Sequence, residues 1–251
     1  MLVHGWCCSV YSWRQTIAPL VAAGRRVVAM DLKGHGLSDK PLEPSAYGRD
    51  QMVAWVAGVL DALGVGPASF VGHSMGGAVT LTLSLREPAR VQRMALLAPV
   101  GFGTINFLQA ARLLSPAFLT RCLPYLVSRR AVRMVLGFAY GPKSRIVEQD
   151  VDEYWAPSQF REYACAMRHL LHAFHWDPGR EEDLRLVSVP TLVMLGADDP
   201  LVVASSAQRL ARKIPGSTLH VLDGIGHVVA EEAPAEVNEA LRRHLGIAAV
   251  A

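Results

Sequence analysis

The sequence has few cysteines, little net charge and no recognisable signal peptide. Its 251 residues include four cysteines, whose spacing matches neither a disulfide framework nor a zinc site. The formal net charge is +3, which is too small to indicate a nucleic-acid-binding protein. Free thiols and the lack of a leader favour a cytoplasmic location.

Long uninterrupted apolar segments are also missing. The most apolar stretch, from Ile105 to Val127, contains two arginines and two prolines. A membrane-spanning helix needs about 20 apolar residues in a row, so we do not expect this stretch to cross a membrane. No internal repeat or low-complexity linker is present. With 51% hydrophobic residues, the chain is expected to form one large α/β domain with a smaller added segment.

The segment Gly72–Gly76 has the pattern Gly-x-Ser-x-Gly, with Ser74 at its centre. It follows the apolar run Ser69–Val71, a predicted strand, and precedes an amphipathic stretch from Ala78 to Leu85. A serine on a tight strand-to-helix turn is held in a strained conformation that exposes its hydroxyl, and the glycines leave room for the turn. The pattern alone also occurs in ordinary glycine-rich turns, but in this context it predicts a nucleophilic serine.

Two later loops supply an acid and a base. The predicted strand Pro190–Leu195 leads to Asp198 and Asp199, and the predicted strand Thr218–Leu222 leads to His227. Catalytic groups collect at the carboxyl ends of parallel strands, so these side chains are expected near the serine. The histidine would take the serine proton, and a carboxylate would fix its tautomer.

In these features the chain resembles the α/β-hydrolase superfamily, of the smaller kind with an inserted cap. The matching segments are His4-Gly5, Asp31–Ser38, Gly72–Gly77, Gly196–Asp199 and Gly226-His227. They cover nearly the whole chain in family order. The resemblance implies a mostly parallel sheet flanked by helices, and no cofactor. It also favours Asp199 over Asp198, because the family places the acid three residues after the glycine.

By the same resemblance, the backbone N–H groups of Trp6 and Met75 form an oxyanion hole, with Cys7 as the alternative to Trp6. Such donors stabilise the oxygen that becomes negative in a tetrahedral intermediate. The side chains around these loops are candidates for the substrate pocket: His4, Gly5, Cys7 and His73.

The middle of the chain interrupts the alternation of strands and helices. We expect residues 1–100 and 181–251 to form the core and residues 101–180 to form a helical cap, inserted after the family's sixth strand, here Arg93–Ala98. The cap carries ten Arg and Lys against six Asp and Glu, a net +4. Whether it opens as a lid over an apolar substrate or is static stays open.

Five other histidines are assigned no catalytic role. His169, His172 and His175 share one face of a predicted cap helix, but no acidic residue completes the spacing, so we expect no metal site. His220 lies in a strand pattern and His244 on a polar helical face, and both are interpreted as structural.

The family usually has two strands ahead of its His-Gly loop, and this sequence begins three residues before that loop. The predicted strand Arg26–Met30 is therefore expected at an exposed edge of the sheet, and self-association through that edge is a hypothesis. Outside the cap, periodicity predicts the following helices: Trp13–Ala23, Arg49–Leu63, Met75–Arg86, Ser205–Ile214 and Pro234–Leu245.

The residue at position 74 restricts which reactions the candidate site can catalyse. The segments Tyr11–Arg14 and Asp31–Pro41 look similar to epoxide hydrolases and haloalkane dehalogenases, which attack an alkyl carbon with an aspartate. An alkylated Ser74 would be an inert ether, so we expect hydrolysis of a small-molecule carboxylic ester with an apolar acyl part. Three alternatives stay open: a serine carbon–carbon hydrolase of ring-fission products, a cofactor-free perhydrolase or haloperoxidase, and a ligand-binding member with little turnover.

Overall fold

The computed structural model describes residues 1–251 except 102–105, 114, 117–126, 177–180 and 248–251. Its described strands form one parallel sheet in the order β2-β1-β3-β4-β5-β6. They are β1 (Leu2–Val3), β2 (Ala29–Met30), β3 (Ala68–His73), β4 (Val91–Leu97), β5 (Thr191–Gly196) and β6 (Thr218–Leu222). The predicted α/β class is confirmed.

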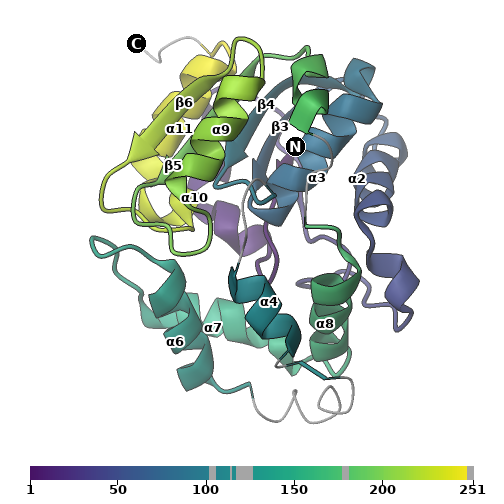
Figure 1. The fold of residues 1–251 in the computed structure, drawn as a ribbon, viewed down its shortest axis with the longest axis vertical. Helices are drawn as coiled ribbons and strands as arrows, with labels where there is room; N and C mark the ends of the chain where they lie inside the picture. The colour runs from purple at the N-terminus through teal and green to yellow at the C-terminus, as the bar shows by residue number, and fades with distance from the viewer. Residues whose placement is uncertain (102–105, 114, 117–126, 177–180, 248–251) are drawn as a thin grey trace.

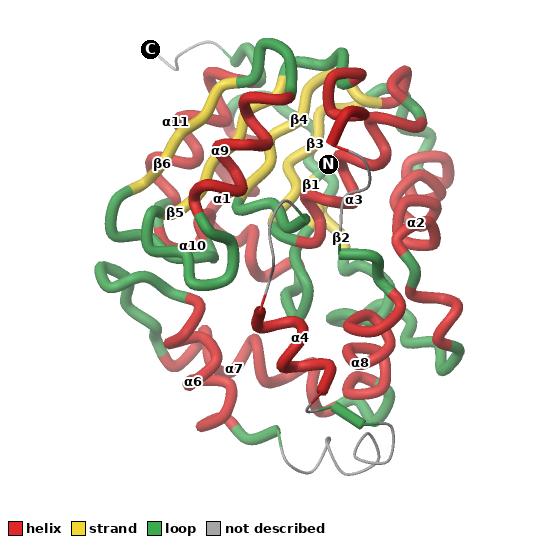
Figure 2. Tube along the Cα trace, in the orientation of Figure 1, coloured by secondary structure: helices red, strands yellow, loops and turns green. Residues whose placement is uncertain are grey.

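Helices cover both faces of the sheet, as Figures 1 and 2 show. The α-helices of the core are α1 (Arg14–Ala22), α2 (Arg49–Ala62), α3 (Met75–Arg86), α9 (Ala204–Lys213), α10 (Val229–Glu232) and α11 (Pro234–His244). Short 3-10 helices join them: η1 (Val10–Trp13), η2 (Pro44–Tyr47), η3 (Pro88–Arg90) and η6 (Glu181–Leu186).

Alternate residues of the central strands build two separate cores. In β4, Met94 and Leu96 pack in the core under α2, α3 and α9, whereas Ala95 and Leu97 pack in the core under α1 and α11. All six residues of β5 are buried. Parallel strands covered on both faces carry such continuous apolar runs, which is why their positions can be predicted from the sequence.

Between β4 and β5 the described elements are all helical. They are α4 (Asn106–Leu113), α6 (Arg129–Ala139), α7 (Glu148–Trp155), η5 (Ala156–Gln159), α8 (Tyr163–Ala173) and η6. Figure 1 shows α4, α6, α7 and α8 gathered at one end of the molecule, apart from the sheet. Cys122 and much of the predicted apolar stretch up to Val127 lie outside the described residues. No described helix is long and apolar enough to cross a membrane.

The predicted core helices agree with the structure to within about two residues, except that Val10–Trp13 forms the separate turn η1 before α1. The predicted strand Arg26–Met30 is shortened to Ala29–Met30, because its partner β1 is itself only two residues long. In the described part of the chain β2 pairs with β1 alone and therefore lies at the sheet edge. Self-association through that edge stays a prediction.

Candidate active site

Ser74 lies on the turn between β3 and α3 with φ 52° and ψ −115°. A positive φ at a non-glycine residue is strained, and the surrounding packing must hold it. A Cβ at Gly72 would lie 2.6 Å from the Gly76 carbonyl oxygen, and a Cβ at Gly76 would collide with the Val3 carbonyl. The two glycines thus allow α3 to start directly against β1, and the hydroxyl faces the end of the sheet at which β3 stops.

His227 bridges Ser74 and Asp199. Its Nδ1 donates to Asp199 Oδ2 at 2.8 Å, which leaves Nε2 to accept from the Ser74 hydroxyl at 2.9 Å. All three residues are buried. Hydroxyl, imidazole and carboxylate in this relay form the arrangement in which the imidazole can remove the serine proton.

The loop after β5 separates the two neighbouring aspartates. Asp199 is buried, and its Oδ1 accepts from the N–H groups of Leu201 and Val202 at 2.8 and 2.9 Å. These bonds fix the carboxylate so that Oδ2 faces His227, whereas Asp198 is exposed. The structure therefore brings Asp199, the residue favoured by resemblance, to the histidine.

The peptide groups around His227 are held by Glu232 and by the end of α6. The N–H of His227 donates to the Ala139 carbonyl of α6 at 2.8 Å. On either side, Gly226 and Val228 donate to Glu232 Oε2 and Oε1 at 3.0 and 2.9 Å. Three consecutive N–H groups are thus engaged, which restricts rotation of the backbone that carries the imidazole.

Glu232 also binds the segment that follows α6. Its Oε2 accepts from Gly141 N–H at 2.7 Å and from the Ser144 hydroxyl. One carboxylate therefore joins the loop of His227 to the chain that follows α6. Sequence analysis missed this residue, because Gly141 and Ser144 lie about 90 positions away and no local pattern marks Glu232.

The adjacent Glu231 makes a second, buried junction. Its carboxylate accepts from Arg14, from the Tyr154 hydroxyl of α7 and from the Tyr140 hydroxyl at 3.0 Å. Arg14 in turn binds Asp150 of α7 at 2.8 Å. Burial and the nearby glutamate raise the pKa of Tyr140, so this phenol stays protonated and donates. Helices α1, α7 and α10 are therefore joined by charge-assisted hydrogen bonds beside the candidate active site.

A cavity of about 540 Å³ lies over Ser74 and His227. Its walls combine core residues with Leu108 of α4 and Val135 and Phe138 of α6. Among the described lining residues none is Arg, Lys, Asp or Glu. The volume is typical of small-molecule sites, and the polar groups are concentrated at the serine and histidine.

The predicted pocket residues divide into two groups. Cys7 and His73 line the cavity. His4 does not, because its buried ring donates from Nδ1 to the Gly5 carbonyl and accepts the Leu32 N–H at Nε2. Gly5 is not among the described lining residues either. It lies against the serine, where an added Cβ would be 3.0 Å from the Ser74 Cβ.

The two predicted oxyanion donors lie close to Ser74. Met75 is the first residue of α3, so its N–H has no acceptor within the helix. Trp6 follows Gly5 in a tight turn closed by the Cys8 N–H on the Gly5 carbonyl at 3.3 Å, with Cys7 at φ 61°. Their role as an oxyanion hole remains a prediction.

Burial sets the protonation of the polar groups beside the triad. Burial and the neighbouring His227 lower the pKa of His73 to about 3. His73 is therefore neutral at ordinary pH, and its Nε2–H donates to the His227 carbonyl at 2.9 Å. Burial and the charge of Glu231 raise the pKa of Cys8 to about 12, so its thiol is not a competing nucleophile.

The remaining histidines are not clustered. His169 stacks on Tyr47 with ring centroids 5.8 Å apart, and His172 Nε2 lies 3.1 Å from the Ser115 hydroxyl. His220 is exposed on β6. Within the described ranges no three His, Cys, Asp or Glu side chains are grouped to hold a metal ion.

Comparison with known proteins agrees with this architecture. The chain is 35% identical to the dihydrolipoyllysine-residue acetyltransferase component of the acetoin cleaving system of Pseudomonas putida, over 97% of its own length. It spans only 63% of that relative. It is 32% identical to the 2-hydroxymuconate semialdehyde hydrolase of Pseudomonas sp. (strain CF600), with 90% of this chain and 79% of the relative covered.

Among solved structures, a meta-cleavage product hydrolase from Pseudomonas fluorescens IP01 superimposes with a TM-score of 0.82. It is 28% identical, with 98% of this chain and 89% of that chain covered. The sequence model of the family described as alpha/beta hydrolase fold matches residues 1–130, which is just over half of the chain. The chain therefore belongs to the α/β-hydrolase family, as its motifs predicted.

Proposed function

We propose that the protein hydrolyses uncharged carboxylic esters through an acyl-enzyme on Ser74. The Ser74 oxygen attacks the ester carbonyl while His227 Nε2 takes its proton, and Asp199 stabilises the resulting imidazolium. The N–H groups of Met75 and Trp6 stabilise the oxyanion. The intermediate collapses, and the alcohol leaves with the proton from His227.

In the second half of the reaction, water takes the place of the Ser74 hydroxyl as the nucleophile. Water enters, His227 removes its proton, and the hydroxide attacks the acyl carbonyl of the ester on Ser74. The carboxylic acid is released and the serine hydroxyl is regenerated. No cofactor takes part in this scheme. We propose further that residues 101–180 act as the cap that closes the apolar cavity over the reacting carbonyl.

The lining of the cavity is the observation that supports a preference for uncharged esters. None of the described residues around Ser74 and His227 is cationic. A substrate carboxylate moved from water into such a wall would lose its hydration without gaining a partner. An apolar acyl or alcohol group would instead gain from burial against Leu108, Val135 and Phe138.

Cleavage of a carbon–carbon bond is the second candidate, and the relatives favour it. Several are named as hydrolases of 2-hydroxy-6-oxo-dienoates or of 2-hydroxymuconate semialdehyde. Such substrates carry a carboxylate, for which the described walls of this cavity offer no cation. The ester is therefore the better match to this chain's own residues.

Parallel assays separate the two candidates. We expect Ser74-dependent turnover of p-nitrophenyl butyrate and octanoate, with little turnover of a 2-hydroxy-6-oxo-dienoate. The Ser74→Ala variant is the control for both substrates. A dienoate turned over with the higher kcat/KM would reject the ester proposal in favour of carbon–carbon hydrolysis. If the Ser74→Ala variant keeps both activities, both candidate functions are rejected.

A further inference from the structure

A second cavity, of about 370 Å³, lies under the cap beside the one over Ser74. We call it the cap chamber. The two cavities are neighbours, because they share five lining residues: Trp6, Cys7, Val135, Leu136 and Tyr154. Ser74, Asp199 and His227 do not line the chamber. The chamber therefore has no role in the reaction scheme proposed above.

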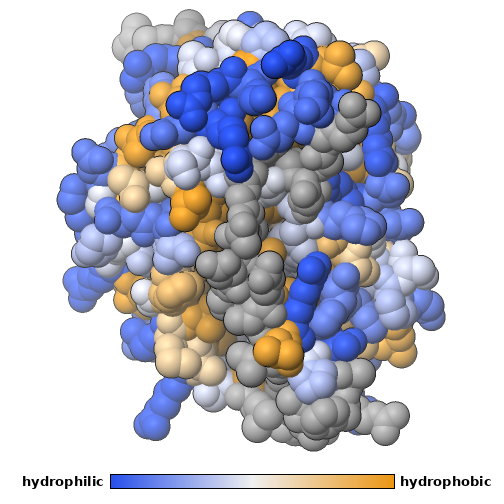
Figure 3. All heavy atoms as spheres, in the orientation of Figure 1, coloured by the Kyte–Doolittle hydropathy of each residue, from blue (hydrophilic) through white to orange (hydrophobic). Residues whose placement is uncertain are grey.

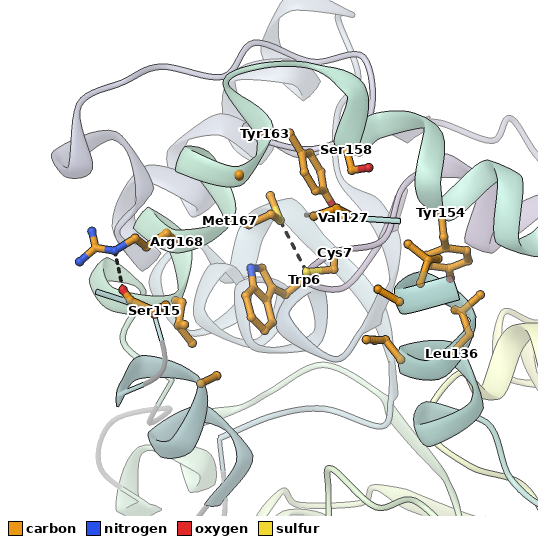
Figure 4. Close-up of a pocket in the computed structure, with 16 residues that line it drawn as sticks. Trp6, Cys7, Ser115, Val127, Leu136, Tyr154, Ser158, Tyr163, Met167 and Arg168 are labelled. Carbon is orange, nitrogen blue, oxygen red and sulfur yellow. Dashed lines mark hydrogen bonds between the residues drawn. The ribbon is translucent and has the colours of Figure 1, made fainter. Parts of the chain in front are cut away.

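The walls of the cap chamber are almost entirely apolar. In Figure 4, Met167 of α8 lies close to Trp6, and Leu136 of α6 lies farther from it. Arg168 is the one charged residue among the described lining residues. Its Nε donates to the Ser115 carbonyl at 2.8 Å, and in Figure 4 its guanidinium points away from Trp6. A charged ligand would find no partner in the interior.

The size of the chamber fits a substantial apolar group. An engineered apolar cavity of about 150 Å³ is enough to bind benzene. A chamber of about 370 Å³ is more than twice as large and can hold a bicyclic ring or a chain of about eight carbons. Burying such a group would stabilise the complex roughly in proportion to its apolar area.

Trp6 and Cys7 form the partition between the two cavities. Cys7 Sγ lies 3.7 Å from Met167 Sδ, and the Trp6 ring packs edge-on against Trp176 with centroids 5.7 Å apart. The buried Trp6 Nε1 has no acceptor among the described residues. Figure 4 shows this nitrogen on the side of the ring nearer Met167. This nitrogen is also closed off from the chamber, because it has almost no exposed surface.

We propose that the cap chamber binds the far end of the substrate. The substrate class is then an uncharged ester with one limb that extends past Trp6 and Cys7 and ends in a ring system or a chain of about eight carbons. The proposal rests on ester hydrolysis at Ser74 and specifies its substrate.

The test fills the chamber without touching the reacting groups. Ala164 of α8 is buried and lines the chamber but not the cavity over Ser74. Ala164→Phe is assayed with p-nitrophenyl esters from acetate to decanoate, which extend the acyl limb, and with acetates from methyl to octyl, which extend the alcohol limb. The matched control is Ala54→Phe, at an exposed position of α2.

We expect Ala164→Phe to keep kcat/KM for p-nitrophenyl acetate within about twofold and to lower it about 20-fold for the longest member of one series. The affected series identifies the limb. A second variant, Met167→Ala, enlarges the chamber and should shift the same series toward longer chains. Equal effects on short and long esters in both variants would overturn the proposal.

These chain-length results differ from failure of the proposed function, in which no ester would show Ser74-dependent turnover in the unmodified protein.

Discussion

Replacement of Glu232 by glutamine tests how the fold positions His227. The carboxylate accepts four hydrogen bonds, one at Oε1 from Val228 and three at Oε2 from Gly141, Ser144 and Gly226. A glutamine of the same shape has one oxygen and one NH₂ group. With the oxygen in the Oε2 place, the NH₂ group faces the Val228 N–H, so two donors oppose each other.

The magnitude follows from the lost bond. A hydrogen bond to a charged group contributes about 1.5–3 kcal/mol, and a donor left unpaired costs a similar amount. If displacement of His227 raises the activation free energy of acylation by about 2 kcal/mol, the acylation rate falls about 30-fold. Because the cavity walls do not change, KM should change little, so the loss appears in kcat.

The assay is the pre-steady-state burst of p-nitrophenol from an octanoate ester, with unfolding followed by circular dichroism. Glu236→Gln, at an exposed position of α11, is the matched control and should behave as the unmodified protein. Ser144→Ala removes only the hydroxyl that donates to Glu232 and should lower the rate less than about threefold. A folded Glu232→Gln variant with an undiminished burst would refute positioning by Glu232.

Three other outcomes are expected. Because the pKa of His73 is lowered from 6.5 to about 3 in the folded protein, the unfolded chain binds an extra proton below pH 6.5. The free energy of unfolding should therefore fall by about 2 kcal/mol between pH 7.5 and 5 because of this residue. In the His73→Gln variant, the unfolding free energy measured in urea should depend less on pH. Iodoacetamide at pH 8 should alkylate Cys8 only after denaturation, because burial raises its pKa to about 12, and rapid labelling of the folded protein would contradict this. Gly76→Ala should lower stability by at least about 2 kcal/mol through collision with the Val3 carbonyl, whereas Gly58→Ala, with nothing within 4 Å of its Cβ, should be neutral or stabilising in thermal unfolding.

The candidate triad could be located from the sequence because each member follows a parallel strand. The runs that became β3, β5 and β6 are apolar and end at a turn, and their carboxyl ends meet at one edge of the sheet. Chain order and strand positions were thus enough to place Ser74, His227 and one of two neighbouring aspartates together. The choice between Asp198 and Asp199 came from the family resemblance, and the burial of Asp199 agrees with it.

Contacts between distant segments could not be predicted. Glu232 looks like any acidic residue on a short helix, and its function in the fold depends on Gly141 and Ser144, which one sequence does not place beside it. His4 was expected in the pocket, yet hydrogen bonds to the backbone turn its ring into the core. The position of Trp6 between the two cavities likewise depends on how α8 packs on the core.

Trapping the covalent intermediate tests the central claim most directly. The protein is mixed with p-nitrophenyl octanoate, quenched with acid within milliseconds, digested and analysed by mass spectrometry, with Ser74→Ala treated in parallel. The account predicts an octanoyl group on the peptide that contains Ser74, formed at the rate of the burst and absent from the variant. Turnover with no acyl group on Ser74, or turnover that persists in the variant, would contradict it.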